Sequence, residues 1–157
     1  MKLHLGCGER YLEGYIHIDL GDFDHIDYQI PVDDLSVFET NSIDEIYASH
    51  VIEYFDRNEV KILLKEWNRV LVDGGILRLA VPNFETLIKV YELTGSIDDI
   101  LGPLYGKWNA TNETTIYHKT VYDKESLTKV LEDATFKEIK EWDWQSVFAS
   151  INYDDHS

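Results

Sequence analysis

The segment KLHLGCGERYLEGYIHIDL, residues 2–20, limits the fold more than any other part of the chain. Its two apolar runs, Lys2–Leu5 and Tyr15–Leu20, have the length and composition of short β-strands. Only Glu9 to Gly14 separate the second glycine of the first run from the second run. A parallel crossover normally takes a dozen or more residues and carries a helix, whereas so few extended residues reach only about 20–25 Å. If the two strands are parallel neighbours, the usual first helix is reduced to a turn.

Strand-like and helix-like segments alternate along the rest of the chain. This alternation is typical of an α/β fold with a mainly parallel, Rossmann-like sheet. The length suits a single domain over residues 1–157. Further strands are expected at His25–Ile30, Asp44–Ser49, Ile76–Val81, Phe136–Trp142 and, with the weakest pattern, Ser146–Ile151.

Three helices are predicted from their end signals and their apolar faces. The first begins at Asp56, three residues before Glu59, in a capping-box arrangement. Asn83 and Asp123 precede the other two. The expected last residues are Gly74 or Gly75 for the first helix and Gly95 for the second, and the predicted apolar faces are Val60, Leu63, Leu64, Trp67 and Leu71, then Phe84, Leu87, Ile88 and Tyr91, then Leu127, Val130 and Leu131.

Charge and composition exclude several classes of function. The chain has 30 acidic and 14 basic residues, a net charge of −16, which disfavours nucleic acid as a substrate. Cys7 is the single cysteine, so no internal disulfide forms. No apolar run approaches the roughly 20 residues that span a bilayer, and no signal-peptide pattern is present. We therefore expect a cytoplasmic protein without a membrane partner, and no His, Cys and carboxylate spacing indicates a metal site.

Gly6 and Gly8 follow the first strand, and Asp19 lies at the end of the second. Ligands of open α/β sheets bind beyond the carboxyl ends of the strands. Glycine lets the backbone approach a ligand closely, and a carboxylate can accept two hydrogen bonds from a ribose diol. The third glycine of the dinucleotide fingerprint is missing. The pattern therefore favours a nucleoside cofactor without a pyrophosphate over a nicotinamide cofactor, although an oxidoreductase stays as a less favoured alternative.

Three longer segments extend this pattern: LHLGCG with HIDL, then DDLSVFETNSIDEIYASHVIEYF, then EWNRVLVDGGILRLAVPNF. In these the chain resembles the class I S-adenosylmethionine-dependent methyltransferases, especially small predicted members that share the pattern LGCG-x-R-Y-L-x-G-Y-I-H-I-D. The resemblance covers essentially the whole chain. It implies a parallel sheet with one antiparallel strand, S-adenosylmethionine as cofactor, and methyl transfer to a small-molecule or glycan acceptor that the sequence does not identify.

The resemblance also implies where the cofactor lies. Gly6 and Gly8 would border its amino-acid part and Asp19 would hold the ribose hydroxyls. Many relatives have an acidic residue at the place of Pro31, so either Asp33 or Asp34 is left to meet the adenine amine, with a solvated loop as the alternative. The full set expected at the cofactor is Gly6, Cys7, Gly8, Asp19, Leu20, Asp33, Asp34, Leu35, Ser49 and His50.

Two histidines are candidate general bases for an oxygen or amine acceptor. His50 follows the strand that ends at Ser49, and a packed structural histidine is the alternative reading. His118 lies in the connection that forms a substrate wall in relatives. Cys7 is expected to be a small packed residue rather than a nucleophile. A protein that binds the nucleoside without catalysis is the second hypothesis for the whole chain.

The end of the chain departs from the family pattern. The tail NYDDHS resembles a polar connection that precedes the last strand in relatives, so we expect the seventh strand to be missing. Ile76–Val81 would then have an unpaired edge through which the protein could form a homodimer. The alternative is that Ser146–Ile151 forms that strand. Thr135 stands where relatives often have glycine and is expected to end a helix under strain.

Overall fold

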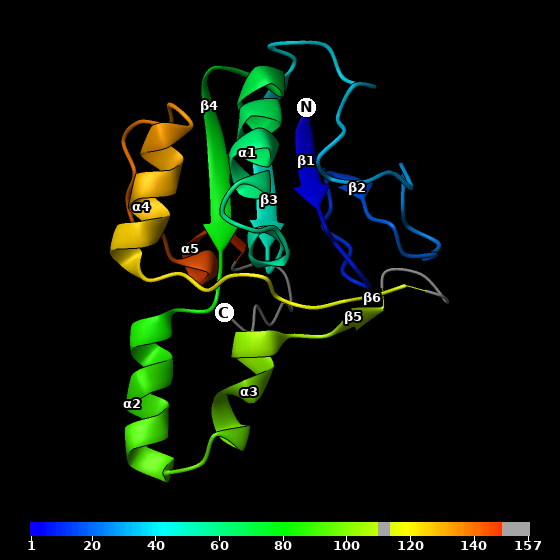
Figure 1. Ribbon diagram of the computed structural model, residues 1–157. Helices are drawn as coiled ribbons and strands as arrows, with labels where there is room; N and C mark the ends of the chain where they lie inside the picture. Colours follow the sequence, from blue (N-terminus) through cyan, green and yellow to red (C-terminus); the bar gives the residue numbers. More distant parts are fainter. Residues whose placement is uncertain (110–113, 149–157) are drawn as a thin grey trace.

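The computed structural model describes residues 1–109 and 114–148. Its main sheet has four parallel strands in the order β2-β1-β3-β4 (Figure 1). Leu3 in the central strand pairs with Ile16 on one side and with Ile46 on the other. The bounds of the strands are β1 Lys2–Leu5, β2 Ile16–Ile18, β3 Ile43–Ser49 and β4 Leu71–Ala80.

The predicted connection without a helix between the first two strands is confirmed. β1 and β2 are parallel neighbours, and only turns and bends lie between them. The backbone N–H of Arg10 donates to the carbonyl of Cys7 at 3.0 Å, and that of Tyr15 donates to the carbonyl of Leu12 at 3.2 Å. Because the chain returns within so few residues, the ends of β1 and β2 are held close to each other.

Helices cover both faces of this sheet. The helical segments are η1 Ile52–Tyr54, α1 Glu59–Val70, α2 Phe84–Thr94, α3 Asp98–Tyr105, α4 Lys124–Asp133 and α5 Trp144–Phe148, and a small hairpin is formed by β5 Trp108–Asn109 and β6 Thr115–Ile116. Helix α1 begins at Glu59 with Asn58, not the predicted Asp56, as its N-cap. The predicted reciprocal hydrogen bonds are present, since Asp56 accepts from the backbone of Glu59 at 2.9 Å and Glu59 accepts from the backbone of Asp56 at 2.7 Å. The predicted N-caps Asn83 and Asp123 also accept backbone hydrogen bonds.

Alternation along the strands sends different side chains to the two faces. Leu3, Leu5 and Ile46 belong to the larger core together with the apolar face of α1. Of the predicted face of that helix, Val60, Leu63, Leu64 and Trp67 are fully buried, whereas Leu71 is the first residue of β4. The opposite face is smaller and more aromatic: its buried residues are Leu12, Tyr47 and Phe148, and Tyr15, Trp142 and Trp144 pack against them.

The predicted strand at Phe136–Trp142 is wrong, because this segment has no strand pairing. It runs to the outer edge of β4, where the indole N–H of Trp142 donates to the carbonyl of Leu79 at 2.8 Å. Residues 144–148 form α5 instead of the start of a strand, and the rest of the predicted Ser146–Ile151 strand lies outside the described residues. Within the described part of the chain, no strand pairs with the outer edge of β4 and the main sheet has no antiparallel member.

Three smaller expectations have different outcomes. The strand expected at His25–Ile30 is reduced to one bridge between Tyr28 and Ile18. Helix α1 ends at Val70 rather than at Gly74 or Gly75, because both glycines lie in β4, where the pairing with β3 shifts register. The strain predicted at Thr135 is confirmed by its φ of +70° just after α4.

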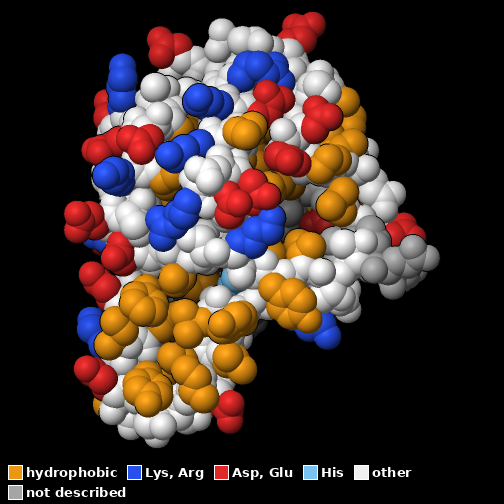
Figure 2. Space-filling model, in the orientation of Figure 1, with side chains coloured by type: hydrophobic (Ala, Val, Ile, Leu, Met, Phe, Trp, Pro, Cys, Tyr) orange, Lys and Arg blue, Asp and Glu red, His pale blue; other side chains and the backbone are white. Residues whose placement is uncertain are grey.

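Helices α2 and α3 form a hairpin that projects beyond the carboxyl ends of the strands (Figure 1). Of the predicted apolar face of α2, only Leu87 is buried. Figure 2 shows apolar side chains gathered over this hairpin; the exposed ones are Phe84, Ile88, Tyr91, Leu93, Ile97, Leu101 and Tyr105. The described helices include none with the length and apolar character needed to cross a membrane.

His4 is a buried titratable group inside the sheet. It is 1% exposed, stacks on Tyr47 with ring centroids 5.0 Å apart, and its Nδ1 has no hydrogen-bond partner among the described residues. Burial is the main cause that lowers the pKa of His4 from 6.5 to about 3, and the charges of His17, Arg10 and His25 lower it further. Burial also lowers the pKa of His17, against the opposing effect of Asp27.

We expect the free energy of unfolding to be fully maintained above pH 6.5 and to fall as the pH drops below that value. Below it, the unfolded chain binds a proton at His4 that the folded chain does not bind. The expected slope from His4 is about 1.4 kcal/mol per pH unit, measured by urea unfolding at several pH values. The variant His4→Phe should lose this part of the slope. An unchanged slope in the variant would show that His4 is not held neutral.

Candidate functional site

The carboxylate of Asp19 connects the ends of β1 and β2. One oxygen accepts a hydrogen bond from the backbone N–H of Gly8 at 2.8 Å, and the other accepts from Gly21 at 2.7 Å. Asp19 is 5% exposed. The backbone N–H of Gly6 donates to the carbonyl of Ile18 at 2.8 Å, so the glycine turn is attached to β2 twice. The sequence prediction that these residues lie together is therefore confirmed in the structure.

Gly6 and Gly8 both have left-handed backbone, with φ of +62° and +53°. A Cβ on Gly6 would collide with Val51, and a Cβ on Gly8 would lie 3.3 Å from the ring of Trp108. The turn is thus enclosed by Val51 on one side and by Trp108 of β5 on the other. Only glycine combines this backbone with the space that remains.

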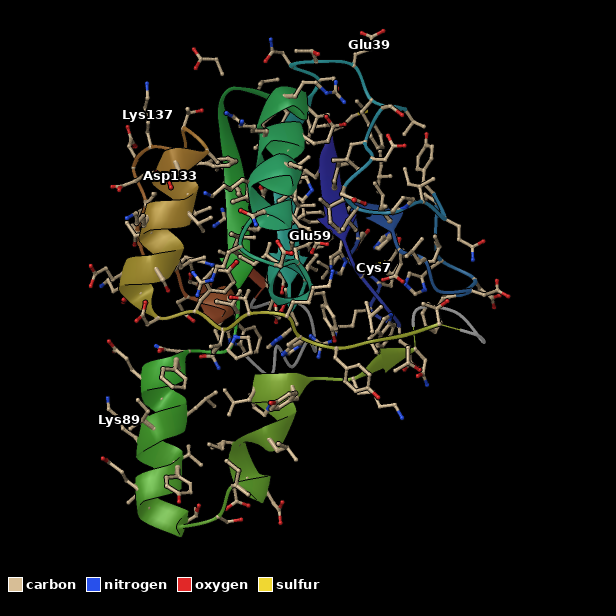
Figure 3. All side chains as sticks on the ribbon, viewed as in Figure 1. Cys7, Glu39, Glu59, Lys89, Asp133 and Lys137 are labelled. Carbon is tan, nitrogen blue, oxygen red and sulfur yellow. The ribbon has the colours of Figure 1, made fainter. Side chains whose placement is uncertain are left out.

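Cys7 lies directly beyond the carboxyl end of β1 (Figure 3) and is 2% exposed. Burial, and next to it the charge of Asp19, raises the pKa of its thiol to about 12. A thiol held neutral in this way is a poor nucleophile. The structure agrees with the reading of Cys7 as a packed residue.

The predicted adenine residues lie in the loop before β3. Asp33 and Asp34 are exposed, and Asp34 accepts from the backbone of Ser36 at 3.1 Å. Leu35 is fully buried in the larger core. Leu20, after β2, is 39% exposed, and Ser49 is partly buried at the end of β3. The carboxylates of Asp33 and Asp34 are therefore free to face solvent or a ligand, whereas the side chain of Leu35 is committed to the core.

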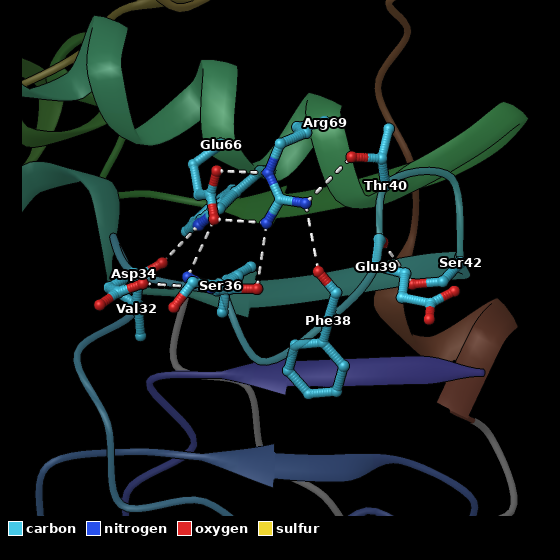
Figure 4. A network of polar contacts seen from close by, with 11 residues as sticks. Val32, Asp34, Ser36, Phe38, Glu39, Thr40, Ser42, Glu66 and Arg69 are labelled. Carbon is cyan, nitrogen blue, oxygen red and sulfur yellow. Dashed lines mark hydrogen bonds and ion pairs between the residues drawn. The ribbon is translucent and has the colours of Figure 1, made fainter.

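A polar network attaches this loop to the end of α1 (Figure 4). Arg69 donates to the carbonyl oxygens of Leu35 and Phe38, each at 3.1 Å. Glu66 accepts from the backbone of Leu35 at 3.1 Å and pairs with Arg69 at 2.7 Å. These contacts fix the course of the loop that carries Asp34.

Beyond β3, two histidines lie on either side of a buried carboxylate. Nδ1 of His50 is 3.1 Å from Oε1 of Glu53, and Nε2 of His118 is 3.9 Å from the same oxygen. Glu53 is 1% exposed. His50 has a φ of +55°, which is costly for a residue with a side chain. Both candidate histidines are thus brought to one site, and Glu53 is the residue that joins them.

Two tyrosines lie around this carboxylate. The ring of Tyr54 meets that of His118 edge to face, with centroids 4.7 Å apart. Burial, and next to it the Glu53 carboxylate, raises the pKa of Tyr54 to about 12. Burial likewise raises the pKa of Tyr122 to about 12, with Arg57 opposing the shift and Glu53 adding to it. Both phenols are therefore neutral near pH 7.

Residues 105–109 and 114–120 lie over the glycine turn and the histidine site. Trp108 reaches Gly8, and His118 reaches Glu53. The backbone N–H groups of Lys119 and Thr120 donate to the carbonyl of Glu53 at 2.8 and 3.2 Å. This segment therefore depends on η1 for its position.

Sequence reasoning found His50 and His118 but missed Glu53 and Tyr122. Glu53 stands three residues after His50, a spacing that places two side chains on the same side of a helical turn. That spacing could have indicated from the sequence that Glu53 lies beside His50. Tyr122 gave none, because its contact with the site depends on the path of the chain after β6.

Comparisons with known proteins agree with this architecture. Residues 21–79 match the family model described as "Methyltransferase domain". A chain in the complex between the Haloferax volcanii Trm112 methyltransferase activator and a candidate methyltransferase is similar, with 17% identity, a TM-score of 0.53, and coverage of 85% of this chain and 59% of that one. A candidate S-adenosylmethionine-dependent methyltransferase from Listeria monocytogenes has 14% identity, a TM-score of 0.47, and coverage of 85% and 75%. A search of curated proteins gave no match.

The structural similarity and the family match bear on different parts of the chain. The first structure shows a shared Rossmann-like α/β fold, and the chain spans less than two thirds of that neighbour's length. The family match runs from just after Asp19 almost to the end of β4, so it includes His50 and Glu53 but not the glycine turn. The family match covers less than half of the chain, and a structure of such low identity shows the fold alone, so the comparisons establish the Rossmann-like α/β fold.

Gly106→Ala is expected to displace His118, because a Cβ at residue 106 would overlap the imidazole ring, and the backbone φ of +41° is unfavourable for alanine. We expect a loss of about 1–3 kcal/mol in the free energy of unfolding and a change in the ring signals of His118 in ¹H–¹⁵N NMR spectra. Gly102→Ala, in α3, is the matched control, because nothing lies within 4 Å of a Cβ there. Identical His118 signals in both variants would contradict the packing described.

Proposed function

We propose that this chain is an S-adenosylmethionine-dependent methyltransferase that transfers a methyl group to a small-molecule or glycan acceptor. The observation that supports it most is the turn of Gly6 and Gly8 held against Asp19 at the carboxyl ends of adjacent parallel strands. This is the edge of an open α/β sheet at which ligands bind. His50, directly after β3, and His118, beside Glu53, lie at the same edge of the sheet. They are the candidate bases that remove a proton from the acceptor.

The residues at this edge fit the cofactor chemically. Each oxygen of Asp19 accepts one backbone hydrogen bond and has a further lone pair for a ribose hydroxyl. The turn at Gly8 allows close approach, since a side chain there would fill the space before Trp108. Asp33 and Asp34, both exposed, remain the candidates for the adenine amine.

When bound, S-adenosylmethionine supplies a methyl group on a sulfonium, whose leaving group is a neutral thioether. The main task of the protein is then to align the acceptor with that methyl group, and alignment can lower the barrier by up to roughly 7–11 kcal/mol. His50 is the first candidate to remove a proton from an oxygen or nitrogen acceptor, and His118 is the second. Displacement of a methyl group from a sulfonium requires no metal ion.

Calorimetric titration with S-adenosylmethionine, in buffer with EDTA, tests the cofactor site. We expect binding by the parent chain and a loss of about 1–3 kcal/mol of binding free energy in Asp19→Ala, because charge-assisted hydrogen bonds to the ribose disappear. Gly8→Ala should weaken binding by at least as much. Gly14→Ala is the matched control: this glycine also has positive φ, at +84°, but nothing lies within 4 Å of its Cβ position.

Two outcomes would reject parts of this proposal. A folded Asp19→Ala variant that binds like the parent would remove the ribose assignment. A parent chain that binds the cofactor but transfers no radiolabelled methyl group to sugars, small metabolites or proteins would favour the alternative of a binding protein without catalysis.

A further inference from the structure

The histidine site contains buried polar atoms that have no partner among the described residues. These atoms are Oε2 of Glu53, Nε2 of His50 and the hydroxyl of Tyr122. Glu53 and Tyr122 are each 1% exposed, so water at the surface does not satisfy them. A buried polar group without a hydrogen bond costs about 1–3 kcal/mol. Glu53 carries one of these atoms itself, its other oxygen contacts His50, and its charge acts on Tyr122, so the three atoms together indicate a place where a polar ligand binds.

The contact between His50 and Glu53 determines which atom of His50 faces that ligand. A carboxylate oxygen accepts hydrogen bonds, so the contact of 3.1 Å between Nδ1 of His50 and Oε1 of Glu53 favours the tautomer with the proton on Nδ1. In the neutral ring, Nε2 then has a free lone pair. It is Nε2 that is buried without a partner. His50 therefore presents a proton acceptor.

His118 faces the same carboxylate from the covering segment. Its Nδ1 is 2.9 Å from the carbonyl of Pro103 and therefore donates to it. Its Nε2 lies 3.9 Å from Oε1 of Glu53, which is too long for a direct hydrogen bond. His50 is thus the histidine joined to Glu53 by a hydrogen bond, and His118 is the one whose position Pro103 fixes.

We propose that Glu53 is the positioning residue of an acceptor subsite, in which it fixes the tautomer of His50 so that Nε2 takes the proton of an O–H or N–H methyl acceptor. This inference rests on the proposed methyltransferase function. In the reaction, the acceptor oxygen or nitrogen forms a bond to the methyl carbon, and the methyl–sulfur bond breaks with its electron pair left on sulfur. The acceptor proton moves to Nε2 of His50, and the imidazolium that forms is stabilised by Glu53.

The fold brings this subsite next to the proposed cofactor turn. Leu5 pairs with Ala48, so the chains that leave β1 and β3 start side by side. Val51, directly after His50, occupies the place where a Cβ of Gly6 would lie. Methyl donor and proton acceptor would therefore meet across the boundary between these two loops.

The acceptor class follows from the atoms that await a partner. Nε2 of His50 and Oε2 of Glu53 both accept hydrogen bonds, and the hydroxyl of Tyr122 can accept or donate. A hydroxyl or an amine supplies the missing donor, whereas a carbon acceptor or a thioether supplies none. We assign the subsite to alcohols, sugars and amines as one chemical class.

The first test needs neither cofactor nor acceptor. In ¹⁵N-histidine protein at a pH above the histidine titration, long-range ¹H–¹⁵N spectra should show His50 as the Nδ1–H tautomer. In Glu53→Gln this preference should weaken, because the amide can donate as well as accept. A parent chain with His50 in the Nε2–H tautomer would overturn the proposal, even if the cofactor binds as expected.

The second test measures methyl transfer from labelled S-adenosylmethionine to a panel of alcohols, monosaccharides, amines and thioethers. Glu53→Gln should lower the turnover at saturation by about 10²-fold, in the range of general base catalysis, with cofactor affinity unchanged. Glu53→Asp should restore part of it. Glu92→Gln, an exposed change on α2, is the control and should match the parent.

The pH profile separates positioning from a purely structural role. The groups that face His50 or its carboxylate are Glu53, His118, Tyr54 and Tyr122, with Arg57 over the ring of Tyr122 at 4.9 Å. Turnover of the parent should rise with pH as a histidine loses its proton, and Glu53→Gln should shift that midpoint. Parent-like turnover and midpoint in Glu53→Gln, or methylation of thioethers alone, would overturn the proposal. Absence of cofactor binding would instead reject the proposed function and leave the tautomer result to decide the role of Glu53.

Discussion

The hydrogen bonds from Gly8 and Gly21 to the carboxylate of Asp19 are the contacts on which the rest of the candidate site depends. The chain has no helix between β1 and β2, so a packed crossover cannot hold the glycine turn in place. The turn is positioned by backbone groups instead: Gly8 donates to the carboxylate of Asp19, and Gly6 donates to the carbonyl of Ile18. Hydrogen bonds to a charged acceptor each contribute about 1.5–3 kcal/mol. We infer that the side chain of Asp19 both holds the glycine turn in place and binds the ligand.

The other part of the candidate site, around His50 and Glu53, has features that reduce the stability of the fold. His50 has positive φ, and Glu53 is a buried carboxylate with one oxygen unsatisfied among the described residues. Strain and unpaired buried groups of this kind occur mainly where function requires them. Residues 105–109 place Trp108 over Gly8, and residues 114–120 place His118 beside Glu53.

Much of the fold could be predicted from the sequence because its signals were local. The spacing between Gly8 and Tyr15 predicted that the first helix is reduced to a turn if the two strands are parallel, and Asn83 predicted the start of α2. The wrong predictions of secondary structure are those in which tertiary contacts determine the conformation. Phe136–Trp142 has the composition of a strand but is fixed by the bond from Trp142 to Leu79, and the glycines after α1 form an irregularity in β4 instead of a helix stop. The apolar face of α2 was correctly recognised as apolar, yet most of it is exposed.

The residues of the candidate site were likewise predictable where the signal was local and not where it depended on tertiary contacts. Gly6, Gly8 and Asp19 were predicted together because their roles follow from the ends of two adjacent strands. His50 and His118 were predicted separately, and their meeting at Glu53 depends on the path of a long connection that no local pattern encodes. Asp33 and Asp34 remain alternatives for the adenine contact, since both lie exposed in the same loop.

The most direct measurement is an amide NMR titration of ¹⁵N-labelled protein with S-adenosylmethionine. The account predicts that the largest shifts occur at Gly6, Gly8, Asp19 and Gly21, with smaller ones at His50 and Val51, while amides at the end of α4 near Asp133 stay in place. No shift at about millimolar cofactor, a concentration that would still detect affinities of roughly −4 kcal/mol, would contradict the account. Shifts that gather on α4, away from the glycine turn, would contradict it equally.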